Sequence, residues 1–292
     1  MGEFELIPHT FLGLAADVSG YETSRLVVLP IGFESTTTYG TGTRAGPDAI
    51  LAASRQIEPY DADLDVDLAV APIHTHAAVA PDLAGPSAMT ERIQRVAGRL
   101  VSDGKWVLGL GGEHSVTLGL VRAAAARHGR LSVLQIDAHA DLRAVWEGTP
   151  YSHACVMRRV AEDGHRTVHV GIRNASREEV DFARSGGRPI FWARDCAASD
   201  AWIDQAVAAL EGPVYLTVDV DGLDPSVIRT TGTPEPGGLG WWATLRLLDR
   251  LFAGRRVVGA DLVELVSAGD AASDFAAARL AARIAALALQ QV

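Results

Sequence analysis

Short apolar runs alternate with longer, helix-like segments along the chain. The short runs are almost continuous in Val, Leu and Ile, which is typical of strands in a parallel sheet covered on both faces. The longer segments carry helix signals: Ser176 and Glu179 form a Ser-x-x-Glu capping box, and Gly104, Gly129 and Gly164 stand where helices end. The predicted strands span residues 25–31, 105–110, 131–137, 166–171, 189–192, 214–220 and 256–264. The predicted helices span residues 47–54, 87–102, 115–128, 153–163, 176 to about 186, and 271–290.

Strands that alternate with helices predict βαβ units, and hence an α/β fold built as a three-layer αβα sandwich around a mostly parallel sheet. The sequence contains no linker-like or low-complexity tract, so we expect residues 1–292 to form a single domain. Open sheets of this kind bind ligands beyond the carboxyl ends of their strands. Polar residues at those ends are therefore the first candidates for chemistry.

Charge and composition narrow the class of protein. The 292 residues include 36 acidic and 26 basic ones, for a formal net charge of -10, which argues against a nucleic-acid partner. A hydrophobic content of 48% is enough to bury a core. The two cysteines, Cys155 and Cys196, form no CxxC pair and are expected to be free thiols. With no signal peptide and no membrane span in the sequence, we expect a soluble cytoplasmic protein without a membrane partner.

Six metal-type ligands follow three of the predicted strands. If the chain stays extended after residue 136, the alternation of Asp137, His139 and Asp141 lets them project to one side. Buried carboxylates need a counter-charge, and this set exceeds what one tetrahedral ion can use, so it predicts two ions that share bridging carboxylates. Ligands of this type, without thiolate, suit Mn²⁺ or a similar ion. A helix-capping role stays open for a single Asp of the set. The six are His114, Asp137, His139, Asp141, Asp219 and Asp221.

Several motifs resemble those of the ureohydrolases, the arginase/agmatinase family, and the resemblance extends over roughly residues 25–290. Their spacing, and the short length of the chain, look most like agmatinase. In combination these motifs are highly specific. They lie at residues 40–47 (GTGTRAGP), 111–115 (GGEHS), 137–141 (DAHAD), 170–173 (VGIR), 217–225 (TVDVDGLDP), 232–238 (GTPEPGG) and 259–264 (GADLVE).

The resemblance implies an eight-stranded parallel sheet and two Mn²⁺ ions per subunit, which carry a bridging hydroxide. Asp137 and Asp219 would bridge the ions; His114 and Asp141 would complete one ligand set, and the remaining pair, His139 and Asp221, the other. The hydroxide would attack the guanidino carbon of a small cationic substrate and hydrolyse agmatine to putrescine and urea. Members of the family form homo-oligomers, so a trimer or hexamer is expected.

The resemblance also assigns catalytic residues. Glu264 would hydrogen-bond the guanidinium N–H groups, and His153 would pass a proton to the leaving amine, so both are expected to bind substrate and to act in catalysis. Asp141 is counted with them as a catalytic residue. The competing explanations are a capping or solvated Glu at a strand end and a structural His at the start of a helix.

Departures from the family pattern bear on the substrate. Glu113 stands where many members have Asp, which we expect to be tolerated. Residues 143–150 lack the Ser/Asn-rich segment that arginases use for the substrate's amino-acid end, which argues against L-arginine. Ser267 and Phe275 stand where a Pro and a Thr are often found, so the substrate tail can differ from that of agmatine.

Three alternatives stay open at this point. The first is another guanidino compound, such as guanidinobutyrate, guanidinopropionate or arginine. The second is a single-zinc deacylase on the same fold. The third is a catalytically silent family member that acts only as an assembly partner.

Other polar and aromatic features suggest no chemistry. The glycines at Gly40 and Gly42 begin too far after the strand for a dinucleotide loop. The acidic run at 61–67 lacks the glycine and closing Glu of a calcium loop, and we interpret it as a solvated edge. Residues 74–76 are predicted to be a surface loop. Trp241 and Trp242 open a helix and are expected to serve packing or a subunit contact.

Overall fold

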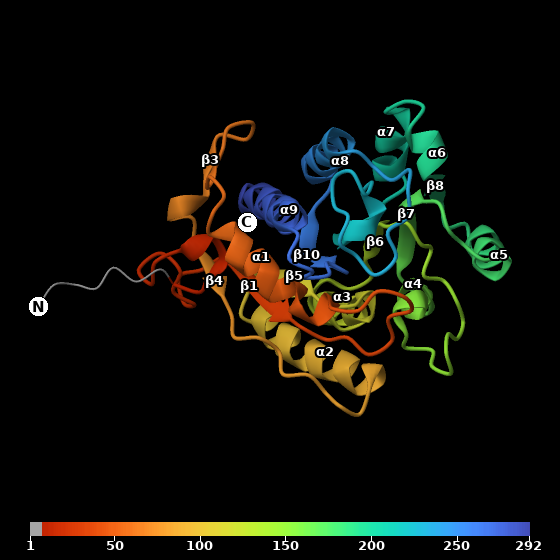
Figure 1. Ribbon diagram of the computed structural model, residues 1–292, viewed down its shortest axis with the longest axis horizontal. Helices are drawn as coiled ribbons and strands as arrows, with labels where there is room; N and C mark the ends of the chain where they lie inside the picture. Colours follow the sequence, from red (N-terminus) through yellow and green to blue (C-terminus); the bar gives the residue numbers. More distant parts are fainter. Residues whose placement is uncertain (1–7) are drawn as a thin grey trace, which may run out of the picture.

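The computed structural model describes residues 8–292 and contains a parallel sheet of eight strands (Figure 1). The strand order is β4-β1-β5-β10-β9-β6-β7-β8. This confirms the predicted αβα architecture, with a sheet that is parallel throughout. The strands are β1 (Leu26–Ile31), β4 (Ile73–Thr75), β5 (Trp106–Gly111), β6 (Ser132–Ile136), β7 (Arg166–Ile172), β8 (Ile190–Trp192), β9 (Val214–Asp219) and β10 (Val257–Val263).

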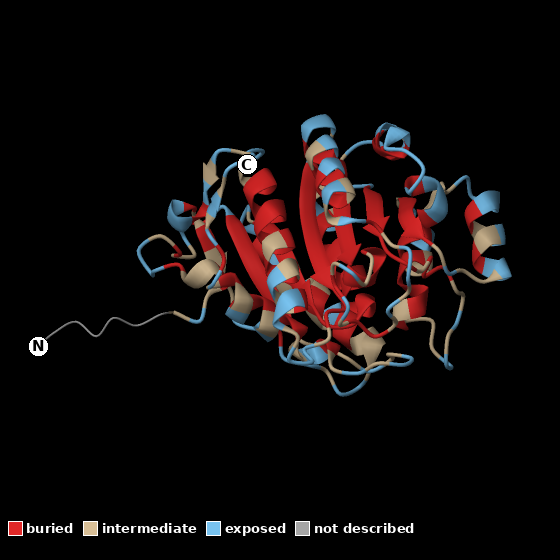
Figure 2. Cartoon of the chain, turned by 45° about the horizontal axis from the view of Figure 1, so that its top comes forward, coloured by how far each residue is buried: buried red, intermediate tan, exposed pale blue. Residues whose placement is uncertain are grey.

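Helices cover both faces of the sheet, and alternate strand residues pack against each layer (Figure 2). Val28 in β1 points toward the layer that contains α1, α8 and α9, whereas its neighbour Val27 points toward α2 and α3. Both faces are therefore apolar, as the continuous hydrophobic runs predict. The longer helices are α1 (Gly46–Ser54), α2 (Pro86–Ser102), α3 (Thr117–His128), α4 (Val156–Glu162), α5 (Arg177–Ser185), α7 (Ala201–Ala208), α8 (Trp241–Gly254) and α9 (Ala271–Leu289).

Several elements differ from the sequence-based expectations. Residues 73–75 form the edge strand β4, where a surface loop was predicted at 74–76, and that prediction was wrong. The strand is three residues long and pairs only with β1, and Ile73 is its single apolar residue, so the sequence shows no apolar run here. The helix α7 was also not anticipated. The acidic run at 61–67 contains a short hairpin of β2 (Tyr60–Asp61) and β3 (Val66–Asp67).

The strand order brings four carboxyl ends together at the middle of the sheet. β10, the last strand in the sequence, lies between β5 and β9, and β6 lies on the far side of β9. The register places Val263 beside Asp219, and Ile136 beside Val218. Segments separated by more than 100 residues therefore end at the same edge of the sheet. Among residues 8–292, no helix combines the length and the apolar character that a membrane crossing requires.

Candidate metal centre and active site

The eight residues predicted to form the site lie at the carboxyl ends of these central strands or in the loops beside those ends. His114 lies three residues after β5 and Glu264 directly follows β10. Asp219 ends β9, and Asp137 directly follows β6. His153 opens a short 3-10 helix before α4. The structure brings all eight together, including His139, Asp141 and Asp221, around one cavity and the carboxylates beneath it.

The first group of possible ligands surrounds Nδ1 of His114. This nitrogen lies 2.9 Å from Oδ2 of Asp141 and 3.1 Å from Oδ2 of Asp137. Oδ2 of Asp219 lies 3.5 Å away. The His114 side chain is buried, and these carboxylates are almost fully buried too. The ring nitrogen and the carboxylate oxygens of Asp137 and Asp219 all lie within 4.8 Å of one another, close enough to bind one ion.

The second group shares Asp137 with the first. Nδ1 of His139 lies 3.1 Å from Oδ2 of Asp221 and 3.6 Å from Oδ1 of Asp137. The two oxygens of Asp137 therefore face different histidines. This is the arrangement expected of a carboxylate that bridges two ions. The geometry agrees with the predicted role of Asp137.

The segment that carries Asp137, His139 and Asp141 reaches this geometry without being extended. Oδ1 of Asp137 accepts a hydrogen bond from the backbone N–H of His139 at 2.6 Å, which turns the chain just after β6. Asp141 has a φ of 53°, in the left-handed region that non-glycine residues rarely adopt. The condition of an extended chain was therefore wrong, although the three side chains do converge. A strained backbone at such a residue is typical of functional sites.

Gly222 allows the loop after β9 to approach the end of β6. A Cβ atom on Gly222 would lie 2.6 Å from the backbone nitrogen of Asp137, closer than real Cβ atoms come. The contact keeps Asp221 beside the 137–141 segment, where Oδ1 of Asp221 accepts a hydrogen bond from Ala138 N–H at 3.0 Å. The glycine in this motif is thus required by packing within the site.

Hydrogen bonds behind His114 show that its Nδ1 suits a cation. Thr217 donates its only hydroxyl proton to Oδ1 of Asp261 at 2.6 Å. Oγ1 of Thr217 also lies 2.9 Å from Nε2 of His114, so this contact needs the proton of Nε2. In the neutral ring, Nδ1 then carries a lone pair, and no hydrogen bond from the described residues reaches it. A buried lone pair that faces three carboxylate oxygens fits a divalent ion.

The shifted pKa values have the same cause. Burial lowers the pKa of His139, but hydrogen bonds to Asp137 and Asp221 outweigh it and raise the value to about 12. Burial and the charge of Asp137 raise the pKa of Asp141 to about 7. Burial, with the charges of Asp221 and Asp137, raises the pKa of Asp219 well above its usual range. Without an ion, protons must supply the positive charge that these groups require.

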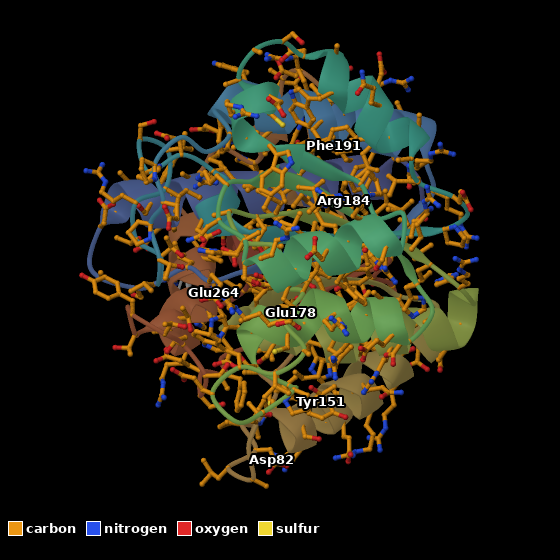
Figure 3. The ribbon with its side chains drawn as sticks, turned by 90° about the vertical axis from the view of Figure 1, so that its right-hand side faces the viewer. Asp82, Tyr151, Glu178, Arg184, Phe191 and Glu264 are labelled. Atoms are coloured by element: carbon orange, nitrogen blue, oxygen red, sulfur yellow. The ribbon has the colours of Figure 1, made fainter. Side chains whose placement is uncertain are left out.

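Glu264 lines the cavity and is labelled in Figure 3. Its φ is 66°, a second strained backbone in the site. Oε1 accepts a hydrogen bond from the backbone N–H of His114 at 2.6 Å. Oε2 accepts none from the described residues and so remains available to a ligand. Burial raises the pKa of Glu264 well above its usual range, so a bound cation would stabilise its charge.

His153 lines the same cavity. Its Nδ1 lies 3.1 Å from Oγ1 of Thr36, and its Nε2 lies 3.2 Å from Oγ1 of Thr38. Burial lowers the pKa of His153 below its usual value of 6.5. A neutral ring at physiological pH can accept a proton and pass it on, which agrees with the predicted role.

The cavity has a volume of about 200 Å³ and an acidic lining. Among its lining residues, Arg143 is the only arginine or lysine, and it lies 3.9 Å from Oε2 of Glu179 and stacks over the ring of Trp146. Phe275, singled out in the sequence, does not line it and is 42% exposed elsewhere on the surface. The carboxylates in the lining are Asp141, Glu179, Asp219, Asp221 and Glu264.

The sequence did not reveal several supporting residues. Thr217 and Asp261 fall inside the quoted motifs but received no role, and Gln135, whose amide donates to Oδ2 of Asp137 at 2.6 Å, was overlooked. A signal did exist for Asp261, because a carboxylate in the middle of an otherwise apolar strand needs a buried partner. Thr36 carries no comparable signal, since it contacts residues that are distant in sequence.

Comparison with known proteins agrees with this geometry. The arginase family model matches residues 24–289. An N(1)-aminopropylagmatine ureohydrolase of Synechocystis sp. is 43% identical over 95% of this chain and 93% of its own length. An agmatinase of Pyrococcus horikoshii is 37% identical, covering 82% of this chain and 83% of its own. The crystal structure of an agmatine ureohydrolase of Thermoplasma volcanium superposes with a TM-score of 0.86 at 31% identity, covering 98% of this chain and 95% of the other. The chain therefore belongs to the arginase family.

Proposed function

We propose that this protein releases urea from an agmatine-type guanidino compound, that N(1)-aminopropylagmatine is its preferred substrate, and that its metal centre holds two Mn²⁺ ions. Membership of the arginase family, with ureohydrolase relatives, makes it a hydrolase of guanidino C–N bonds. One observation carries the proposal: Asp141, Asp219, Asp221 and the free oxygen of Glu264 line the same small cavity, and Nδ1 of His114 lies 2.9 Å from the Asp141 carboxylate.

The two ligand groups suit the chemistry that a guanidino group requires. A guanidinium is resonance-stabilised and a poor electrophile, so its hydrolysis needs a strong nucleophile in a fixed position. Two divalent ions bound by these residues would supply it by lowering the pKa of water. Imidazole and carboxylate ligands without thiolate favour Mn²⁺ among the ions that do this.

Glu264 orients the substrate in this proposal. Its Oε1 is held by the N–H of His114, which leaves Oε2 to accept hydrogen bonds from the guanidinium. Because Asp141 and Asp221 line the same cavity, a guanidinium bound to Glu264 would present its carbon to both ligand groups. Charge-assisted pairing of this kind also discriminates against neutral ureas.

His153 supplies the proton for the leaving group. The neutral ring of His153 first takes up the proton that the attacking water releases. When the C–N bond breaks, the amine nitrogen keeps the electron pair and takes this proton from the ring. The lowered pKa of His153 makes this transfer favourable, because the ring gives up its proton more readily than an exposed histidine. The products are urea and a primary amine.

The acidic lining of the cavity favours a substrate with a cationic tail. Two divalent ions would offset the charges of the Asp side chains, but the charge of Glu264 would remain beside the substrate. The single arginine, Arg143, is compensated by Glu179 at 3.9 Å. The relative that is 43% identical acts, by its name, on N(1)-aminopropylagmatine, and the one that is 37% identical on agmatine. These observations favour the longer polyamine over agmatine. Arg143 is also the one observation that favours a second candidate, 4-guanidinobutyrate, whose carboxylate it could bind.

A urea-release screen on Mn²⁺-loaded protein tests the proposal. The compounds are N(1)-aminopropylagmatine, agmatine, 4-guanidinobutyrate and L-arginine. We expect kcat/KM to be highest for the first and lowest for L-arginine. A preference for 4-guanidinobutyrate would instead assign Arg143 to a substrate carboxylate. Urea release from none of them, with metal bound, would support a silent assembly partner.

The Asp137→Asn variant tests the shared ligand. We expect loss of bound metal and of urea release, because both groups lose the same carboxylate. Asp163→Asn is the matched control, since Asp163 pairs with Arg122 on the surface. Full metal content and activity in Asp137→Asn would rule out the two-ion site, and one zinc per wild-type chain would favour the deacylase alternative.

A further inference from the structure

We infer that Glu113, acting through the hydroxyl group of Thr36, is a positioning residue that fixes which ring nitrogen of His153 carries the proton. The inference deepens the proposed function, because it concerns the proton donor of that reaction. It rests on the hydrogen bonds around a buried carboxylate that is not one of the predicted ligands.

Glu113 is fully buried and forms no salt bridge with the described residues. Its carboxylate instead accepts four hydrogen bonds. Oε2 accepts the backbone N–H groups of Ser35 and Thr36 at 2.5 and 2.6 Å. Oε1 accepts the hydroxyl groups of Thr36 and Ser115 at 2.9 and 2.5 Å. Four donors saturate a carboxylate, so each of these four groups points its proton at Glu113.

The single hydroxyl proton of Thr36 is therefore committed to Glu113. Toward its other neighbours, Oγ1 of Thr36 can act only as an acceptor. It accepts the backbone N–H of His153 at 3.1 Å, and it also lies 3.1 Å from Nδ1 of the same ring. That second contact is a hydrogen bond only if Nδ1 carries a proton. In the opposite tautomer the lone pair of Nδ1 would face the oxygen of Thr36 at 3.1 Å, or the hydroxyl would turn away from Glu113 and leave two oxygen lone pairs facing each other at 2.9 Å. The hydroxyl of Ser152 also lies near Nδ1, but at 3.4 Å it is the more distant neighbour.

The consequence lies at the other ring nitrogen. With Nδ1 protonated, Nε2 of the neutral ring has the free lone pair, and it is within 3.2 Å of the hydroxyl of Thr38, which lines the cavity. Nε2 is then the atom that gains and loses the proton during the reaction. Without Thr36, the ring could exchange its tautomers or rotate, and its basic nitrogen could face away from the substrate.

Activity measurements on Thr36 variants test this role. We expect Thr36→Val to lower kcat about 10- to 100-fold with KM and metal content unchanged, and Thr36→Ser to restore kcat to within about 3-fold of wild type. The control is Tyr39→Phe, which removes an exposed hydroxyl from the same loop. In a His153→Ala background, Thr36→Val should cause no further loss, because its effect passes through the ring. An equal further loss there, or wild-type kcat in Thr36→Val, would overturn the inference.

A spectroscopic measurement separates this inference from the proposed function. Nitrogen shifts of ¹⁵N-histidine-labelled protein loaded with diamagnetic Zn²⁺ report the tautomer of His153, whose signals are assigned by their loss in His153→Ala. We expect a protonated Nδ1 in wild type and in Thr36→Ser, and a mixture or an Nε2–H ring in Thr36→Val. An Nε2–H ring in the wild type would refute the inference even if urea is released. The expected tautomer without urea release would refute only the proposed function. If Thr36→Val does not fold, Glu113→Gln tests the same tautomer, with Glu113→Asp as its conservative partner.

Discussion

The imidazole Nε2 of His114 lies 2.9 Å from Oγ1 of Thr217, and the hydroxyl proton of Thr217 goes to Asp261. These two hydrogen bonds orient the imidazole ring of His114 so that Nδ1 faces the carboxylates. Removing the outer partner of a metal-binding histidine typically costs 10- to 100-fold in metal affinity. We expect that loss for Thr217→Val and a much smaller one for Thr217→Ser, measured by competition with a chelating dye. Equal affinity in wild type and Thr217→Val would show that the relay does not act on the metal.

Metal binding should release protons and strengthen as pH rises. In the absence of an ion, hydrogen bonds to Asp137 and Asp221 overcome burial and keep His139 protonated, with a pKa of about 12. Asp141, whose pKa is raised to about 7, is also protonated below neutrality. An incoming cation must displace these protons, so the Kd should fall between pH 6 and pH 8. Calorimetric titrations in buffers of different ionisation enthalpy count the protons; a Kd that does not change with pH would contradict the assignment.

Glu264→Gln should weaken the stabilisation of the transition state and leave the metal content unchanged. Glutamine can still accept the N–H of His114 through its amide oxygen, but it lacks the charge that pairs with a guanidinium. A hydrogen bond to a charged group contributes about 1.5–3 kcal/mol, so we expect a fall in kcat/KM of about 10- to 100-fold. Metal content measured in the same samples is the control. A variant that keeps full kcat/KM would place the guanidinium elsewhere.

Gly222→Ala should disturb the site through the backbone. The new methyl group would lie 2.6 Å from the nitrogen of Asp137, so one of the two segments must move. We expect weaker metal binding, measured by metal retention after dialysis. Gly98→Ala is the matched control: Gly98 is in α2 with open space around it, and alanine there should raise the free energy of unfolding by up to about 1 kcal/mol.

Replacing Arg283, which lies far from the site, should lower the free energy of unfolding. Its side chain is 6% exposed and donates to Asp61 at 2.7 Å and to Asp249 at 2.8 Å, which ties the β2–β3 hairpin to α8 and α9. Because Asp249 is itself 41% exposed, we expect Arg283→Met to lower the free energy of unfolding by about 2 kcal/mol, less than for a fully buried pair. Arg250→Met, which breaks an exposed pair with Asp204, should cost under about 1 kcal/mol. Urea denaturation compares the two.

The central strands and the place of the candidate ligands at their ends could be predicted from sequence because both follow local rules. An apolar run of five to seven residues marks a covered parallel strand, and Asp137 or Asp219 at its end marks the ligand edge. The strand β4 escaped because a three-residue edge strand has neither length nor apolar character. Its existence depends on pairing with residues of β1 that lie 47 positions earlier in the sequence.

The supporting hydrogen bonds escaped for a different reason. Thr36 lies 117 residues from His153, and Thr217 lies 103 residues from His114. A threonine has the same local signature whether its hydroxyl faces water or a buried carboxylate. Only the fold decides which threonines face the site. Candidate ligands can therefore be identified from the sequence, but the groups that orient them cannot.

The place of β10 in the sheet also has a consequence for biosynthesis. This strand is the last to leave the ribosome, yet it separates β5 from β9 and so sets the gap that His114 and Asp219 must share. A nascent chain that stops before residue 257 has both of these residues but nothing to hold them at the correct spacing. Pairings this distant in sequence form late in folding. The ligand group around His114 therefore forms only in a finished chain, whereas Asp137, His139 and Asp221 follow β6 and β9, which pair directly with each other.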